Sequence, residues 1–323
     1  MSNLVFAQTI ESHFRYFLKE LRMTGKSEYT IISYNTTITS FVRFLKQYER
    51  EINFSTIKKL DLMNFLDYKN AMLQKQTELK ASSKNLYIIH LKTFFTYILE
   101  NMDENGIKIS TIFNLKIKVP ESSPKGIADE DIYKIIAYLN ALDKNYFLNV
   151  RISLLVKMYL YTGARRDELR NVKISDFHEM PDRESYVVNT IGKGQKERTL
   201  YILKELVKEE LLCYKKYNIE RIALSARTHK LMNGSQIYKF LNTHYRKAGV
   251  NETGVHILRH TFAKTQHANG TNIVQLQKML SHAKLQSTMI YTNPTQDDVY
   301  RAQIASMHKI IKKKDIDEYS KAI

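Results

Sequence analysis

Residues 148–169, LNVRISLLVKMYLYTGARRDEL, contain the stretch that decides the fold. The segment from Leu148 to Tyr161 is almost continuously apolar, which predicts a helix that is buried on most of its sides. Gly163 ends this helix, and Arg165 follows where the chain leaves the interior. Because a buried helix needs other elements packed around it, the segment predicts the centre of a mainly helical domain.

Downstream of this helix the pattern changes to that of a small sheet. Tyr186–Thr190 and Glu197–Ile202 are rich in β-branched and aromatic residues, and Gly192 to Gln195 separates them. This arrangement predicts a β-hairpin, the only sheet that we expect in the chain. Helical spacing returns from Leu203 onward, and the segment HILRH (residues 256–260) lies near the start of one of these later helices.

Upstream, the first third of the chain predicts four helices. Apolar residues recur at steps of three and four, as in Phe6, Ile10, Phe14 and Phe17. We expect this aromatic stripe to form a core, and not a stacking platform for nucleic-acid bases, because its spacing is helical and polar residues lie between.

The starts of the later helices in this region are marked by residues that favour N-caps. Ser27 is the expected cap of the second helix, Asp61 of the third, and Ser82 or Ser83 of the fourth.

A linker divides the chain into two domains. Residues 116–126, KIKVPESSPKG, hold two prolines, two serines and a glycine and lack apolar periodicity. We therefore predict a helical domain over residues 1–115, a linker over 116–126 and a second domain over 127–323. The basic ends of the linker suit either a solvated connector or contact with a phosphate backbone.

The composition indicates a polyanionic partner. The 323 residues include 50 Lys plus Arg and 33 Asp plus Glu, a formal charge of 50 − 33 = +17. Nucleic acid fits this excess better than a membrane, since no long apolar run and no signal-peptide pattern are present, and we expect a cytoplasmic protein. The single cysteine, Cys213, excludes an internal disulfide, and we expect it to be a small apolar residue on a helix.

Two cationic residues are candidates for contacts to phosphate. Arg165 is anchored by the end of the buried helix, and Glu168, three residues later, can pair with it and hold its orientation. Lys193 lies between two glycines in the hairpin turn, where it can act as a general acid, with Lys196 as a competitor for that role. Taken singly, each residue is better explained as an ordinary solvated surface charge.

The HILRH segment places His256, Arg259 and His260 on one helical face. A zinc-protease motif would need a glutamate after the first histidine, but Ile257 stands there, which argues against a metal site. A histidine and an arginine that face an anion can instead move a proton and stabilise charge. We expect His260 to point inward as a hydrogen-bonded support.

His282 and Tyr291 lie nine residues apart in SHAKLQSTMIYTNP. Tyr291 is one of 21 tyrosines, and nothing in its immediate neighbours distinguishes it from a packed aromatic residue. Because a phenol has a pKa of about 10, a reactive tyrosine needs nearby cations or bases, and the preceding candidates are of that kind.

Together these segments resemble the catalytic domain of tyrosine recombinases, most of all the Xer-type and phage integrase branch. The resemblance extends by motif over residues 127–307, and it departs from the family at Arg166, Asp167 and Ser281, where Ser281 replaces a common glycine. YTGARRDEL is similar to the first-arginine box, IGKGQKERTLYI to the hairpin, HILRHTFA to the H-x-x-R box and MLSHAKLQSTMIYT to the last box. The matching catalytic positions are Arg165, Lys193, His256, Arg259, His282 and Tyr291, and Glu168 matches the acidic helper.

The resemblance implies a fold, a reaction and partners. The fold is mainly α, with an N-terminal four-helix, SAM-like, DNA-clamping domain and an α-rich catalytic domain that has a small antiparallel hairpin or sheet. Tyr291 attacks a DNA phosphate and forms a 3′-phosphotyrosyl link, Lys193 protonates the leaving 5′ oxygen, and no metal ion or other cofactor takes part. Strand exchange proceeds through a Holliday junction.

The implied partners are a double-stranded DNA recombination site and copies of this chain, two on one site and four in synapsis, with a DNA translocase as a possible activator. Val299, Ile304, Met307 and Ile311 recur near helical spacing, which predicts a C-terminal tail helix that packs either on a neighbouring protomer or on its own domain.

Four functions stay open at this point. Within the same chemistry, resolution of chromosome or plasmid dimers competes with integration of a phage or mobile element, and the compact length favours the first. A type IB topoisomerase shares the reaction but fits His282 and the separate helical domain less well. A non-catalytic, sequence-specific DNA-binding protein explains the charge but not six retained chemical groups.

Overall fold

The computed structural model shows two compact units, Met1–Ser122 and Ser123–Ile323, and each is described by itself. The boundary lies inside the segment predicted as a linker. The structure describes residues 2–73, 78–101, 115–119, 126–181, 184–192, 197–225, 228–252, 254–282, 284–291 and 304. The hairpin turn with Lys193 and Lys196, and the predicted tail apart from Ile304, lie outside these residues.

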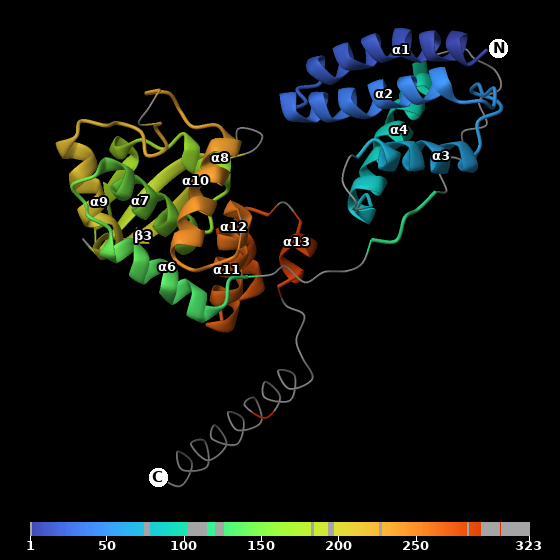
Figure 1. The fold of residues 1–323 in the computed structure, drawn as a ribbon. Helices are drawn as coiled ribbons and strands as arrows, with labels where there is room; N and C mark the ends of the chain where they lie inside the picture. The colour runs from blue at the N-terminus through green and yellow to red at the C-terminus, as the bar shows by residue number, and fades with distance from the viewer. Residues whose placement is uncertain are drawn as a thin grey trace. The chain divides into compact units, whose positions relative to one another are not determined.

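The first unit is built from four helices in its described part, as predicted (Figure 1). They are α1 (Asn3–Met23), α2 (Glu28–Gln47), α3 (Lys59–Ala71) and α4 (Ala81–Asn101). The aromatic stripe forms the core: Phe41 and Phe65 meet edge to face with their centroids 5.2 Å apart, and Phe94 is fully buried. The expectation that these rings pack inside the domain is therefore confirmed.

The helix starts in this unit follow the predictions only in part. Ser27 caps α2 by accepting a hydrogen bond from Thr30 N at 3.3 Å. Asp61 is not the cap of α3: Lys58 is, and Asp61 accepts from Lys58 N at 2.6 Å from three residues inside the helix. The fourth helix begins at Ala81, so Ser82 and Ser83 lie within its first turn. The Asp61 carboxylate is buried and pairs with Arg50 as well as with the backbone of Lys58. Asp61 therefore lies inside the helix and not at its cap.

The second unit is mainly helical and has one small sheet (Figure 1). The elements of this unit are α6 (Asp129–Ala141), α7 (Phe147–Thr162), α8 (Arg166–Arg170), the 3₁₀ turn η1 (Ile174–Asp176), β1 (Phe177–Glu179), β2 (Ser185–Ile191), β3 (Glu197–Leu203), α9 (Lys204–Lys216), α10 (Gly234–Lys247), α11 (Val255–Ala268), α12 (Ile273–Leu280) and α13 (Gln286–Met289). No helix in the described part of the chain has the length and apolar composition needed to cross a membrane.

Helix α7 is the buried centre of this unit, as its composition predicts. It packs against α6, α9, α10 and α11. The helix ends at Gly163, whose φ of 59° is left-handed. A Cβ at this position would lie 2.4 Å from the Phe262 ring of α11, so both the backbone and the packing require glycine. This tight end fixes where Arg165 leaves the interior.

The sheet has the order β1-β2-β3 and is antiparallel throughout. The predicted hairpin is present as β2 and β3, with Val188 opposite Leu200 on the buried face. Strand β1 was not predicted, because three residues are too short to show an alternating pattern. The fold class predicted from the sequence is thus confirmed, with one additional edge strand.

Candidate active site

Arg165 stands at the junction between α7 and α8, where it is the N-cap of α8. Its backbone N–H donates to Glu168 Oε2 at 2.7 Å, and its guanidinium donates to Glu168 Oε1 at 2.9 Å. The same guanidinium donates to the carbonyl oxygen of Ser281 at 2.9 Å. Two anchors on separate elements therefore hold the Arg165 head group, while about a third of its side chain remains exposed.

Glu168 is shared by two arginines. Its side chain is buried, and Arg198 of β3 forms an ion pair with Oε2 of the carboxylate. Burial acts to raise the pKa of the Glu168 carboxyl, but Arg198 and Arg165 outweigh this effect and hold that pKa below its usual value. Glu168 is consequently an anion that fixes two guanidinium groups at once.

Arg259 projects from α11 into the same region and is only 5% exposed. Its guanidinium donates to the carbonyl oxygens of Gly163, at the end of α7, and Leu280, at the end of α12. Burial, followed by repulsion from Arg165 and Arg198, lowers the pKa of Arg259 to about 9. Helix C-termini suit this cation because their last carbonyl groups lack partners within the helix.

These contacts leave an excess of positive charge. Arg165, Arg198 and Arg259 gather around the single carboxylate of Glu168, and both Arg198 and Arg259 donate to the Gly163 carbonyl. Within this group the balance is three cations against one anion. Such a cluster is stabilised by a bound anion, and arginine forks match the oxygens of a phosphate group.

His282 follows α12 and is held on both sides. Its Nδ1 lies 2.9 Å from Thr288 Oγ1, and Gln277 Nε2 donates to its backbone carbonyl at 3.0 Å. Burial and then Arg259, Arg165 and the other nearby cations lower the pKa of His282 to about 4. The preceding Ser281 adopts a left-handed φ of 49°, which explains structurally why glycine is common there in the family that the sequence resembles.

The other two histidines lie on α11, one turn apart. His256 is exposed, but part of its ring is shielded from water. This partial burial, followed by the charges of Arg259, Arg166 and Arg165, lowers the pKa of His256. His260 was expected to point inward as a support. Its hydrogen-bond partner is the nucleophile candidate itself, with His260 Nδ1 2.7 Å from Tyr291 Oη.

Tyr291 follows α13 and is 9% exposed. It packs into a small apolar cluster with Phe262, Leu276 and Leu280, so its ring is held by α11 and α12. Burial raises the pKa of the Tyr291 phenol, and the charge of Arg259 opposes that rise. Five of the six catalytic candidates and both supporting residues are thus described and converge on the ends of α7 and α12, while Lys193 lies outside the described residues.

Two residues of this site were missed by reasoning from the sequence. Arg198 alternates with Leu200 and Ile202, so its inward position on β3 was visible in the strand pattern, and a charge at an inward position requires a partner. Thr288, which is fully buried against His282, carries no comparable signal, because threonine is common on helix surfaces and cores alike.

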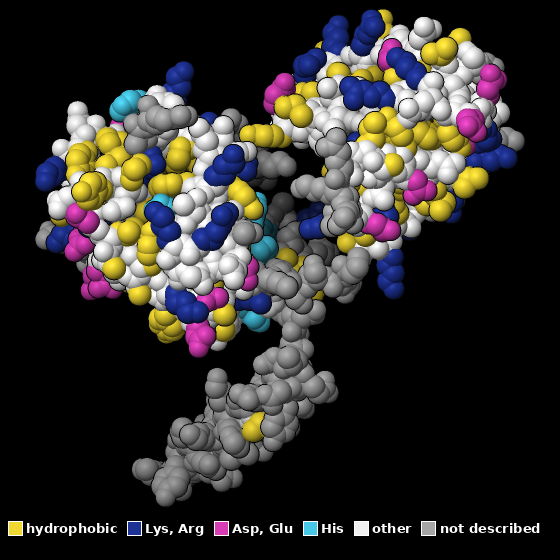
Figure 2. All heavy atoms as spheres, in the orientation of Figure 1, with side chains coloured by type: hydrophobic (Ala, Val, Ile, Leu, Met, Phe, Trp, Pro, Cys, Tyr) yellow, Lys and Arg dark blue, Asp and Glu magenta, His cyan; other side chains and the backbone are white. Residues whose placement is uncertain are grey.

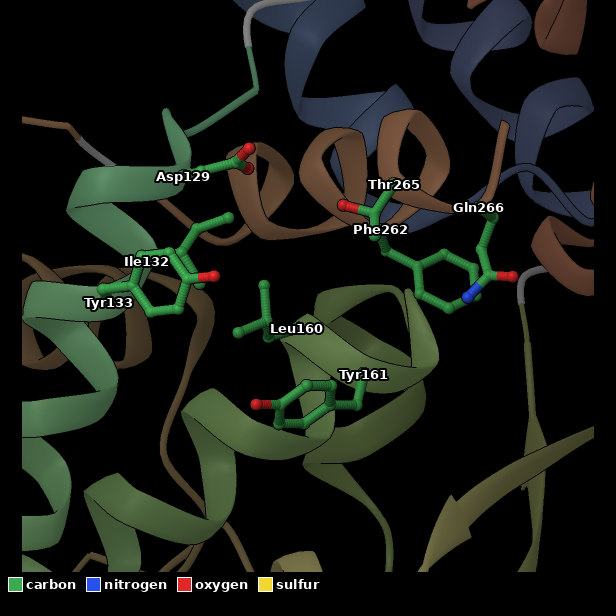
Figure 3. Close-up of a pocket in the computed structure, with 8 residues that line it drawn as sticks. All are labelled: Asp129, Ile132, Tyr133, Leu160, Tyr161, Phe262, Thr265 and Gln266. Carbon is green, nitrogen blue, oxygen red and sulfur yellow. The ribbon is translucent and has the colours of Figure 1, made fainter. Parts of the chain in front are cut away.

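A cavity of about 220 Å³ lies on the same unit, between α6, α7 and α11 (Figure 3). Side chains of α6, α7 and α11 face one another across it, among them Ile132, Tyr133, Leu160 and Phe262. None of the described catalytic candidates lines it. The described residues also contain no group of three or more His, Cys, Asp or Glu side chains arranged to hold a metal ion.

Lysine and arginine side chains are spread over the visible faces of both units (Figure 2). In the first unit, Lys69 of α3 donates to Ser40 of α2 at 3.1 Å and lies over the Tyr87 ring of α4, 5.1 Å from its centroid. Burial, and then the charge of Arg43 on α2, lower the pKa of Lys69.

Comparison with protein families gives a match over both units. Residues 126–297 match the phage integrase family, and residues 14–101 match the N-terminal SAM-like domain of phage integrases. The chain belongs to the phage integrase family. It is therefore a tyrosine recombinase, and the interpretation of its sequence motifs is confirmed at the level of the family.

The relatives of this tyrosine recombinase include Xer proteins over nearly their whole length. It is 26% identical to tyrosine recombinase XerD of Oceanobacillus iheyensis, over 90% of this chain and 96% of that protein. It is 29% identical to tyrosine recombinase XerA of Pyrococcus horikoshii, over 86% of this chain and 88% of that protein. Both matches therefore extend over most of this chain.

Solved structures show the same fold. A XerH site-specific recombinase bound to a palindromic difH substrate matches with a TM-score of 0.68 and 23% identity, over 90% of this chain and 83% of that one. A lambda integrase dimer bound to a COC′ core site matches with a TM-score of 0.62 and 16% identity, over 85% and 95% of the two chains. The helical first unit and the mixed second unit are thus the architecture of this family.

Proposed function

We propose that this protein is a site-specific DNA recombinase that cuts and rejoins DNA through Tyr291. The observation that carries the proposal is the cluster of Arg165, Arg198 and Arg259 around one carboxylate, beside a buried tyrosine. This cluster supplies a phosphate site with unbalanced positive charge and an adjacent nucleophile. The solved relatives bound to DNA support the choice of DNA as the substrate.

Each group has a role in the proposed reaction. Tyr291 Oη attacks the phosphorus and forms a 3′-phosphotyrosyl bond, the bond from phosphorus to the 5′ oxygen breaks, and Lys193 gives that oxygen a proton. Arg165 and Arg259 neutralise the non-bridging oxygens, whose charge grows in the transition state, and His256 and His282 assist proton transfer and orient the phosphate. Because the covalent link conserves the bond energy, rejoining needs no ATP.

A nicked-DNA assay tests this proposal. DNA that binds the full-length chain is first selected from a random-sequence library, and a nicked duplex of the selected sequence then traps cleaved product. We expect a covalent protein–DNA adduct with the unaltered chain and none with Tyr291→Phe, measured on denaturing gels, while both bind the duplex equally. An adduct with Tyr291→Phe would show that another residue is the nucleophile.

The same assay separates the alternative functions. Tight binding of selected DNA without any adduct from the unaltered chain would identify a non-catalytic DNA-binding protein. We propose the Xer-type role, resolution of chromosome or plasmid dimers in the cytoplasm, in place of integration of a phage or mobile element. The near-complete coverage of XerD and XerA relatives supports this choice. A DNA translocase is the proposed activator.

We further propose that two protomers bind each site, that four form the synaptic complex, and that a Holliday junction is the intermediate. One solved relative is a lambda integrase tetramer bound to a Holliday junction, which supports this assembly. The C-terminal tail is the proposed link between protomers, and the apolar walls of the cavity between α6, α7 and α11 suit the side chains of Val299, Met307 and Ile311 (Figure 3).

Deletion of residues 300–323 tests the role of the tail. We expect the shortened chain to fold and to bind site DNA, but to assemble into tetramers less well because the link between protomers is missing. Light scattering on site DNA measures the assembly. Unchanged assembly would mean that the tail packs elsewhere.

A further inference from the structure

The hydrogen bond between His260 and Tyr291 goes beyond the roles given above, and the inference drawn from it rests on the proposed function. Nδ1 of His260 lies 2.7 Å from the Tyr291 hydroxyl oxygen. The two residues are 31 positions apart, and the ring of Tyr291 is held in place by Phe262 and Leu276. The contact is therefore made by packed elements, α11 and the segment after α13, and not by local chain geometry.

The nucleophile needs a base. A phenol with a pKa of about 10 carries little phenolate at neutral pH, and burial raises the pKa of Tyr291 further. A group that removes the phenolic proton as the oxygen attacks must lie within hydrogen-bond distance of that oxygen. In the part of the chain that the structure describes, His260 is the side chain recorded in that position.

The other two histidines are placed for different tasks. His282 has its Nδ1 next to Thr288 Oγ1, and His256 is exposed one turn before His260 on α11. No hydrogen bond from either of them to Tyr291 is recorded among the described residues. His260 is thus distinguished from both by its direct contact with the reacting oxygen.

We infer that His260 is the general base that takes the proton of Tyr291 during cleavage and returns it during rejoining. In cleavage the bond between Tyr291 Oη and phosphorus forms, the bond from phosphorus to the 5′ oxygen breaks, and the phenolic proton moves to His260 Nδ1. Lys193, the acid in the proposed function, gives the 5′ oxygen its proton. In rejoining, the 5′ hydroxyl attacks phosphorus and returns its proton to Lys193, the bond between phosphorus and Tyr291 Oη breaks, and His260 gives its proton to the leaving Tyr291 oxygen.

The electrostatic surroundings keep this histidine in the form that accepts a proton. Burial, and then the neighbouring His256, Arg259 and Lys264 of α11, lower the pKa of His260 below its ordinary value of 6.5. His282, after α12, faces the same group: burial, three arginines and the charge of His260 lower the pKa of His282 to about 4. Since the neutral form is the base, activity should be full above that pKa and should fall as the pH drops through it.

A pH series of single-turnover cleavage tests the inference on the nicked duplex of the selected site. In His260→Gln the amide oxygen can accept the hydrogen bond of Tyr291 but cannot take its proton. We expect cleavage at neutral pH to fall about 10²–10⁴-fold, the usual contribution of a general base. The decline of the rate on the acid side should disappear in this variant, and the rate should continue to rise with hydroxide concentration.

Two further variants complete the design. His260→Ala leaves space beside Tyr291, and we expect added imidazole to restore cleavage, which a purely structural histidine would not allow. His267→Gln changes an exposed histidine two turns later on α11 and should retain the unaltered rate.

The outcomes separate this inference from the proposed function. Cleavage by His260→Gln within threefold of the unaltered rate and with the same decline at acid pH, or failure of imidazole to act on His260→Ala, would overturn the role of His260 while the recombinase assignment stands. Absence of any adduct from the unaltered chain would overturn both.

Discussion

Asp61 of the first unit and Glu168 of the second are both buried carboxylates, at 0% and 2% exposure, and both lie three positions after the N-cap of their helix. Asp61 pairs with one arginine, Arg50, whose side chain is 38% exposed, and accepts from Tyr48 Oη at 2.9 Å. Glu168 pairs with two arginines, and a third lies close by. The same local arrangement, a buried carboxylate three positions after the N-cap, therefore holds one arginine in the first unit and two in the second.

The difference between the two clusters is their charge balance. Around Asp61 one anion meets one cation that reaches water, so the cluster is complete and stabilises the packing of α3. Around Glu168 the cations exceed the anion, and repulsion among them persists until an anion binds. The balanced cluster around Asp61 indicates a structural role, and the unbalanced one around Glu168 beside the candidate nucleophile indicates a binding site.

Of the variants that test this difference between the clusters, Arg165→Ala is expected to have the largest effect, a loss of DNA cleavage. The alanine retains the backbone N–H that donates to Glu168, and Arg198 still pairs with that carboxylate, so the fold should persist. We expect single-turnover cleavage of nicked site DNA to fall about 10²–10³-fold, as when one group that stabilises transition-state charge is removed.

Arg246→Ala is the control, because this arginine lies on α10, where its side chain is exposed and is not one of the ion-pair partners of Glu168. Equal loss of cleavage in both variants would mean that general positive charge, and not the Glu168 cluster, binds the phosphate.

Glu168→Gln is expected to have the next largest effect. The substitution removes the one negative charge among the three arginines and turns an accepting oxygen into a donor that faces Arg198 or the Arg165 backbone. Breaking a buried pair in this way should cost about 3–5 kcal/mol of unfolding free energy, measured by urea denaturation. Cleavage should fall as well, since Arg165 loses its anchor. Stability equal to that of the unaltered chain would refute the view that Glu168 balances the cluster.

Asp61→Asn should have a smaller and separate effect. The amide presents a donor to Lys58 N or Arg50, and one buried hydrogen bond lost in this way costs about 1–3 kcal/mol. Urea denaturation should show that loss in the first unit, while cleavage, measured at saturating protein, stays within twofold. A large loss of cleavage would contradict the assignment of the Asp61 cluster to structure alone.

Much of the fold followed from patterns that are local in the chain. The apolar run before Gly163 predicted α7 and its end, because a left-handed residue is needed to stop a buried helix there. Alternation over residues 186–202 predicted β2 and β3. The N-cap predicted at Asp61 was wrong, since a carboxylate three residues into the helix can satisfy the same backbone group while it pairs with Arg50.

The sequence by itself determined the family, the two-part organisation and the order of the candidate residues, because helix periodicity, strand alternation and short motifs are encoded over a few residues. Only the tertiary structure decided that Arg198 joins Glu168 and that His260, in place of His256 or His282, touches Tyr291. These contacts join residues that are 30 and 31 positions apart. They depend on how α8 lies against β3 and on how α11 and α12 hold Tyr291, and side-chain packing between distant segments leaves no periodic trace in the chain.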